Sequence, residues 1–145
     1  IGNVLSMATL FMIAGSLFAA WLGVRIGRTI PVVGATILCA LTSILVTNAD
    51  SLAVYAGGLF LYNLAYLFLG PYVIAGISSA LDPSGRLASA VGGVMFLSYS
   101  VGIGTGGFIA ELTSLAGIGY LGLCTCLLAA PLFAIVTTQI QKQES

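Results

Sequence analysis

The chain has 145 residues, of which 59% are hydrophobic and 6% are charged, and its formal net charge at pH 7 is +0. A soluble domain carries charge on about a quarter of its residues, because its surface faces water. The composition therefore excludes a soluble domain and predicts an integral membrane protein whose first partner is the lipid bilayer. The zero net charge gives no indication of a nucleic-acid partner.

Apolar segments long enough to cross a bilayer, which takes about 20 residues in a helix, follow one another along the chain. Charged and turn-forming stretches such as TNAD and DPSGR separate them. An open sheet cannot satisfy its backbone hydrogen bonds in lipid, so we expect each segment to be a helix. The sequence predicts an all-α membrane protein, a single transmembrane domain over residues 1–145, with five spans at about 4–24, 30–46, 52–81, 87–110 and 118–138.

The third segment, residues 52–81, is longer than one span needs, so we expect it to tilt, kink or protrude. Pro71 lies inside it and has no N–H to bond to the carbonyl of Leu67. Gly70 beside it eases a bend. The pair predicts a hinge, although ordinary membrane helices also contain prolines.

The basic residues indicate the orientation in the membrane. With five spans, the first gap, the third gap and the C-terminal tail lie on one side, and they contain Arg25, Arg28, Arg86 and Lys142. The gaps on the other side contain only acidic charge. The positive-inside rule makes the basic side cytoplasmic. We expect a multi-pass protein of the inner or plasma membrane with its N-terminus outside and its C-terminus in the cytoplasm.

The first gap reads WLGVRIGRTIP and contains the spacing R-x-G-R in Arg25, Gly27 and Arg28. This stretch resembles the signature loop of the major facilitator superfamily (MFS), usually written G-x-x-x-D-R-x-G-R-R. Val24 stands in place of the aspartate, which makes the weaker copy in the C-terminal half of such transporters the better match. The loop LDPSGRLASAVGG and the glycine-rich SVGIGTGGFIAE resemble the start and the outer end of the eleventh helix.

The resemblance implies that the five spans are helices eight to twelve of such a transporter, part of a six-helix half. The chain begins at Ile1 rather than at a methionine, so we expect it to be a fragment whose further partner is the missing N-terminal half. The implied function is secondary transport of a small solute by alternating access. The resemblance also makes the loop residues Arg25, Gly27, Arg28, Asp82 and Arg86 a cytoplasmic gating latch, the alternative being that the arginines only anchor the topology.

Two groups of residues inside the spans are candidates for lining a substrate cavity. Tyr62, Asn63 and Tyr66 lie close together on the third span, and an asparagine within a span is costly unless it meets a partner or water. The alternative is that these groups bond between helices. The second group lies on the fourth span and comprises Phe96, Tyr99 and Ser100. Such a lining suits a neutral or amphipathic solute.

The sequence offers no chemistry for an enzyme. No nucleophile–base pair or metal-ligand cluster is visible, so we expect no enzymatic activity, no metal and no cofactor. Cys39, Cys124 and Cys126 read as buried free thiols. The stretch GIGTGG fits a dinucleotide-binding pattern, but it lies inside an apolar span and is better read as a helix-packing motif.

Two alternatives to an MFS transporter stay open from the sequence. One is another polytopic transporter or the permease subunit of a pump. The other is a membrane scaffold subunit that transports nothing. The sequence of a longer parent protein would discriminate between them, because further upstream spans and a second, stronger R-x-G-R-R loop favour the MFS reading.

Overall fold

The computed structural model describes residues 2–22, 26–27, 29–70, 73 and 77–144. Within these ranges it describes the side chains of all residues except 2–6, 8, 9, 11, 12, 79, 95, 96, 99, 143 and 144. Arg25, Arg28 and Pro71 lie outside the described residues.

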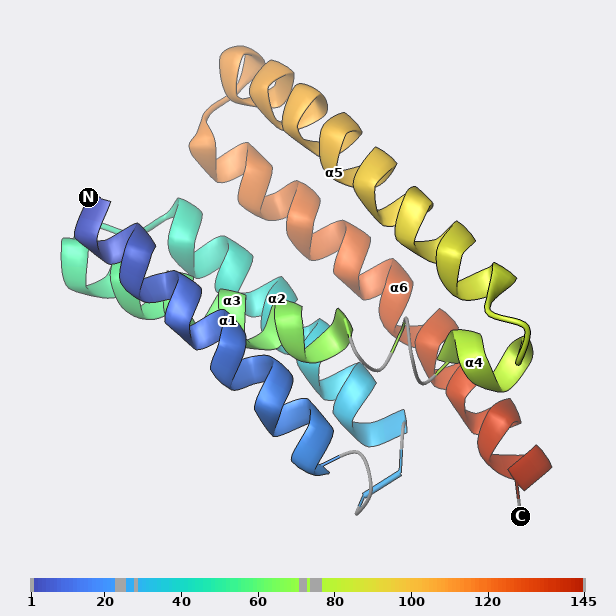
Figure 1. Ribbon diagram of the computed structural model, residues 1–145. Helices are drawn as coiled ribbons and strands as arrows, with labels where there is room; N and C mark the ends of the chain where they lie inside the picture. Colours follow the sequence, from blue (N-terminus) through green and yellow to red (C-terminus); the bar gives the residue numbers. More distant parts are fainter. Residues whose placement is uncertain (1, 23–25, 28, 71–72, 74–76, 145) are drawn as a thin grey trace.

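The described part of the chain is helical and contains no strand (Figure 1), which confirms the predicted all-α class. Its helices are α1 (Gly2–Leu22), α2 (Thr29–Thr47), α3 (Leu52–Gly70), α4 (Ser78–Leu81), α5 (Arg86–Leu112) and α6 (Leu115–Glu144). Thr29 and Pro31 open α2, where a proline costs no backbone hydrogen bond.

Three of these helices are long and apolar enough to cross a membrane. They are α2, α3 and the segment Leu115–Lys142 of α6. The 19 residues of α2 or α3 extend about 28 Å, close to the thickness of about 30 Å of the hydrocarbon layer. The chain is therefore a membrane-embedded helical protein. The count of five spans stays a prediction, since the described side chains of α1 give only the shorter apolar stretch Ile13–Leu22.

The described helices differ from the predicted spans mainly at the end of the chain. In the predicted segment 52–81 the structure describes α3 up to Gly70 and α4 from Ser78, and between them only Val73 and Ile77. The last helix continues beyond residue 138 to Glu144. Gln, Lys and Glu in this polar stretch are good helix formers, so the end of the apolar run does not end the helix.

The helix α2 is central to the bundle. It packs against α3 on one side and against α6 on the other, and α1 packs against α3. A small core joins these helices: Val32 is fully buried, and it clusters with Ala19, Ala35 and Phe68. In contrast, α5 has its main packing contacts with α6 and α4 and runs along the outer side of α6 (Figure 1).

The pairing of α2 with α6 is antiparallel and close. Near one end, the Ser43 hydroxyl donates to the carbonyl of Ala40 over 2.8 Å and lies 3.3 Å from the carbonyl oxygen of Gly119. Near the other end, the Thr29 hydroxyl donates to Oε1 of Gln141 over 3.1 Å. The absence of a side chain at Gly119 permits this approach, because a Cβ there would meet Oγ1 of Thr47 and lie 3.1 Å from the carbonyl oxygen of Ser43. Small residues allow such backbone contact in membranes, where no hydrophobic force between helices is available.

We expect Gly119→Ala to lower the stability of the bundle by about 1–3 kcal/mol, because its methyl group forces α2 and α6 apart. Thermal unfolding in detergent micelles measures the change. The matched control is Gly34→Ala, since a Cβ at Gly34 meets nothing within 4 Å. Equal melting temperatures for the two variants would contradict the close packing at Gly119.

Candidate functional site

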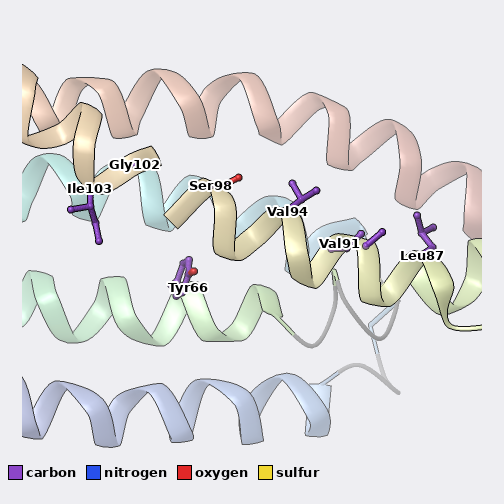
Figure 2. Close-up of a pocket in the computed structure, with 8 residues that line it drawn as sticks. Tyr66, Leu87, Val91, Val94, Ser98, Gly102 and Ile103 are labelled. Carbon is purple, nitrogen blue, oxygen red and sulfur yellow. The ribbon is translucent and has the colours of Figure 1, made fainter. Parts of the chain in front are cut away.

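A cavity of about 670 Å³ lies between α3 and α5. Tyr66 contributes its wall on α3, and one face of α5 contributes the rest, as Figure 2 shows. The lining residues on α5 recur every three or four positions, which is the spacing of one helix face. They are Leu87, Ala90, Val91, Val94, Ser98, Gly102 and Ile103.

A second cavity, of about 630 Å³, continues from the first toward α6. Ser98 and Gly102 line both, so the two cavities are neighbours, and we name them together the α3–α5–α6 cavity. The second part adds Tyr62 from α3. Its other lining residues are Leu97, Val101, Thr105 and Gly106 of α5, and Ile118, Leu121, Gly122 and Thr125 of α6.

The α3–α5–α6 cavity has no charged residue among its described lining residues. Its polar groups are all hydroxyls, and they belong to Tyr62, Tyr66, Ser98, Thr105 and Thr125. The remaining lining is aliphatic or glycine. A cavity with an apolar wall and a few polar groups is the usual form of a binding site for a small molecule.

The two tyrosines of the cavity form a stacked pair. The ring centroids of Tyr62 and Tyr66 are 6.1 Å apart and the planes are inclined by 6°. Their i, i+4 spacing puts them on the same face of α3, one turn apart. Since each ring is amphipathic, the pair offers a ligand a flat apolar surface with hydroxyl groups at its edge.

The other predicted cavity residues lie elsewhere or are not described. The side-chain amide of Asn63 donates to the carbonyl of Leu59 in its own helix over 2.8 Å, and Asn63 is not a lining residue of either described cavity. Ser100 lies exposed on α5, also outside both linings. The side chains of Phe96 and Tyr99 lie outside the described residues.

Sequence reasoning missed three hydroxyl residues of the cavity, Ser98, Thr105 and Thr125. A signal for the first two was present. Leu87, Val91, Val94, Ser98 and Thr105 follow one helical face of α5, and this face also contains Gly102. The prediction of Phe96 and Ser100 rests on the aromatic and polar content of their face, and helical periodicity places Ser100 almost opposite Ser98.

The gap between α1 and α2 contacts the end of α6. Gly27 has a φ of 75°, a left-handed conformation that favours glycine. A Cβ at this position would collide with the side-chain amide of Gln141, whose oxygen also accepts the hydrogen bond from Thr29. Glycine at position 27 therefore permits both the left-handed turn and the close approach of the Gln141 side chain from α6.

Asp82 closes the turn that leads into α5. Its Oδ1 accepts hydrogen bonds from the backbone N–H of Ser84 (2.9 Å) and from the Ser84 hydroxyl (2.6 Å), and its Oδ2 accepts one from the N–H of Leu87 (3.0 Å). The hydroxyl of Ser84 and these N–H groups favour the carboxylate and hold the pKa of Asp82 below its usual value. Arg86, the first residue of α5, is exposed. Since Arg25 and Arg28 lie outside the described residues, a latch to Asp82 stays a prediction.

The described cysteines and acidic residues form no metal site. No group of three or more His, Cys, Asp or Glu side chains comes together among the described residues. The thiols are free: Cys39 is buried and Cys126 half-buried, but Cys124 is exposed on α6, contrary to the expectation of burial. The C-x-C spacing turns one of the two away from the bundle.

Comparisons with known proteins find no matching family model, no matching curated protein and no matching solved structure.

We expect Asp82→Ala to lower the melting temperature at neutral pH, because the turn before α5 loses its acceptors. The pKa of Asp82 is lowered in the folded state, so its contribution is complete above the ordinary value of 3.8 and disappears as the pH falls through the folded-state value. Thermal unfolding between pH 7 and pH 3 should thus show the variant and the parent converging at acidic pH. The control Asp50→Ala removes an exposed carboxylate between α2 and α3, and should change stability little at any pH. A difference for Asp82→Ala that stays constant with pH would contradict the role of its carboxylate.

Proposed function

We propose that this chain is the C-terminal part of an MFS secondary transporter, which carries a small solute across the inner or plasma membrane by alternating access. The observation that carries the proposal is the uncharged α3–α5–α6 cavity, with two tyrosines on one wall and hydroxyls on the others. The order of the R-x-G-R, D-x-x-G-R and glycine-rich stretches supports the choice of family. In this proposal α3 and α4 together form one span. The five spans, from α1 to α6, then correspond to helices eight to twelve of the transporter.

The proposed topology has five spans and a cytoplasmic C-terminus. The hydrogen bond between Thr29 and Gln141 supports it, since it brings the first gap and the end of α6 to the same end of the bundle. Arg86 opens α5 at that end, and Lys142 lies in the last turn of α6 (Figure 1). Asp50 follows α2 and Glu111 lies in the last turn of α5, both at the opposite end. This separation of charge is what the positive-inside rule requires.

Alternating access assigns roles to the elements of the chain. The bundle would rock against the N-terminal half of the transporter, with solute bound between them near the bilayer midplane. A bend at Gly70 and Pro71 during this motion follows from the proline in the sequence, which has no N–H to bond to the carbonyl of Leu67. The loop with Asp82 and Arg86 and the loop with Arg25 and Arg28 would meet at the cytoplasmic end and balance the two states. The described lining residues include no Asp, Glu, Lys, Arg or His that could carry a coupled proton. In this proposal, a residue that couples transport to a proton or another ion would lie in the N-terminal half.

In the full-length transporter, we expect Tyr66→Phe to raise the KM for the solute about twofold to tenfold, the range for loss of one hydrogen bond. The ring stays, so the melting temperature should change little. Tyr55→Phe is the matched control, since Tyr55 is on the same helix but lines a separate hollow beside Asp50. We expect Asn63→Ala to change the KM less than Tyr66→Phe does, because Asn63 is outside both cavity linings and its amide donates to the carbonyl of Leu59. Unchanged transport in Tyr66→Phe together with a lower melting temperature would show Tyr66 to be structural.

The 145-residue chain alone should not transport, because alternating access needs both halves. The measurement is uptake of a panel of neutral solutes into proteoliposomes that contain the chain. Protein-free liposomes give the leak, and liposomes with the full-length transporter give the positive signal. Saturable uptake by the chain alone would overturn the assignment to one part of an MFS transporter.

A further inference from the structure

We propose that the α3–α5–α6 cavity binds an uncharged amphipathic molecule through a hydrogen-bond donor on that molecule, an O–H or N–H group next to an apolar or aromatic body. This inference rests on the proposed function, because it takes the cavity as the solute site. It goes further by naming the group that the solute presents.

Two exposed threonines from different helices contribute polar groups to the part of the cavity next to α6. Thr105 of α5 donates its hydroxyl hydrogen to the carbonyl of Val101 over 2.8 Å. Thr125 of α6 donates its own to the carbonyls of Leu121 (3.0 Å) and Gly122 (2.9 Å). A hydroxyl has one hydrogen and two lone pairs, so each threonine keeps only acceptor capacity for a ligand. Acceptors on facing helices favour a ligand that donates.

The rest of the lining determines the charge of the ligand. Tyr62, Tyr66 and Ser98 have hydroxyls that adapt to either role, but no Lys, Arg or His is among the described lining residues to stabilise an anion. No Asp or Glu is there to stabilise a cation. Moving an ion from water into such a cavity costs several kcal/mol without a partner of opposite charge. The lining therefore selects against carboxylates, sulfonates and phosphates.

The two parts of the cavity differ, which fixes how the ligand lies. The part toward the start of α5 is aliphatic, with Leu87, Val91 and Val94 on its wall, and Tyr66 of α3 lines the same cavity near Ser98 and Ile103 (Figure 2). The part toward α6 contains both threonines. The apolar body lies in the first part against the ring of Tyr66, and the donor reaches Thr105 and Thr125.

Three probes that share one aromatic body test this inference. They are 2-naphthol, which donates a hydrogen bond, 2-methoxynaphthalene, which does not, and 2-naphthoate, which is an anion. Binding to the 145-residue chain in lipid nanodiscs is measured by probe fluorescence at neutral pH, with empty nanodiscs subtracted. We expect 2-naphthol to bind about twofold to tenfold more tightly than 2-methoxynaphthalene, the ratio for one hydrogen bond between neutral groups. Of the three probes, 2-naphthoate should bind least.

The double variant Thr105→Val/Thr125→Val keeps the shape of both side chains and removes both acceptors. It should reduce the ratio between 2-naphthol and 2-methoxynaphthalene to about one while 2-methoxynaphthalene binds as before. The matched control is Thr138→Val, because Thr138 makes the same bond to its own helix, to the carbonyl of Ala134 over 2.7 Å, and is exposed outside both cavities. This control should keep the full ratio. Unchanged binding of 2-methoxynaphthalene shows that the double variant has folded.

Four results would overturn the inference, and the first three concern the ratios. They are equal binding of 2-naphthol and 2-methoxynaphthalene, tightest binding of 2-naphthoate, and a ratio in the double variant equal to that of the control. Binding of no probe would overturn it as well, since a lipid chain or a further helix would then fill the cavity. None of these results decides the proposed function, because the transport measurements on the full-length protein do not depend on the donor preference.

Discussion

The antiparallel contact of α2 with α6 is the interaction on which the other features depend. Glycine at position 119 lets the two backbones approach, and polar contacts at Ser43 and Thr29 fix the pair near both ends. Because α2 also packs against α3, and α3 packs against α1, the helices α1, α2, α3 and α6 share one small core. The helix α5 joins this group mainly through α6 and α4. The contact between α2 and α6 therefore determines where α5 lies, and with it the cavity between α3 and α5.

Lipid imposes a second constraint, which is that each polar group must find its partner within the protein. The described threonines of the spans largely solve this within one helix, as Thr36 does with the carbonyl of Val32 and Thr137 with that of Phe133. Asn63 does the same with Leu59. Such bonds make polar residues tolerable in a helix that crosses the membrane, and they also decide what those residues can offer to a ligand. A hydroxyl that has satisfied its own helix is left as an acceptor.

The sequence was sufficient for the elements and less informative about their faces. The helical class and the approximate limits of α2 followed from apolar length. The hinge at Gly70 and Pro71 stays a prediction, because Pro71 lies outside the described residues. Tyr62 and Tyr66 could be proposed as cavity residues because tyrosine hydroxyls inside a span need partners. The face of α5 that lines the cavity could not be predicted in the same way, since both faces of this helix are apolar with a few small or polar residues. The face that turns toward α3 is determined by the packing of α5 against α6, and the sequence of α5 alone does not determine this packing.

The length of α6 has a consequence for the membrane that surrounds the protein. Its 30 residues extend about 45 Å, whereas the hydrocarbon layer is about 30 Å thick. A helix of this length crosses the layer only if it tilts or extends past the lipid tails, and its last turns carry Gln141, whose amide lies beside Gly27. Bilayer thickness thus sets the solvent around this contact. In a thin bilayer the amide lies in water, which competes for its hydrogen bonds, and in a thick one it lies among headgroups, where the same bond to Thr29 is stronger.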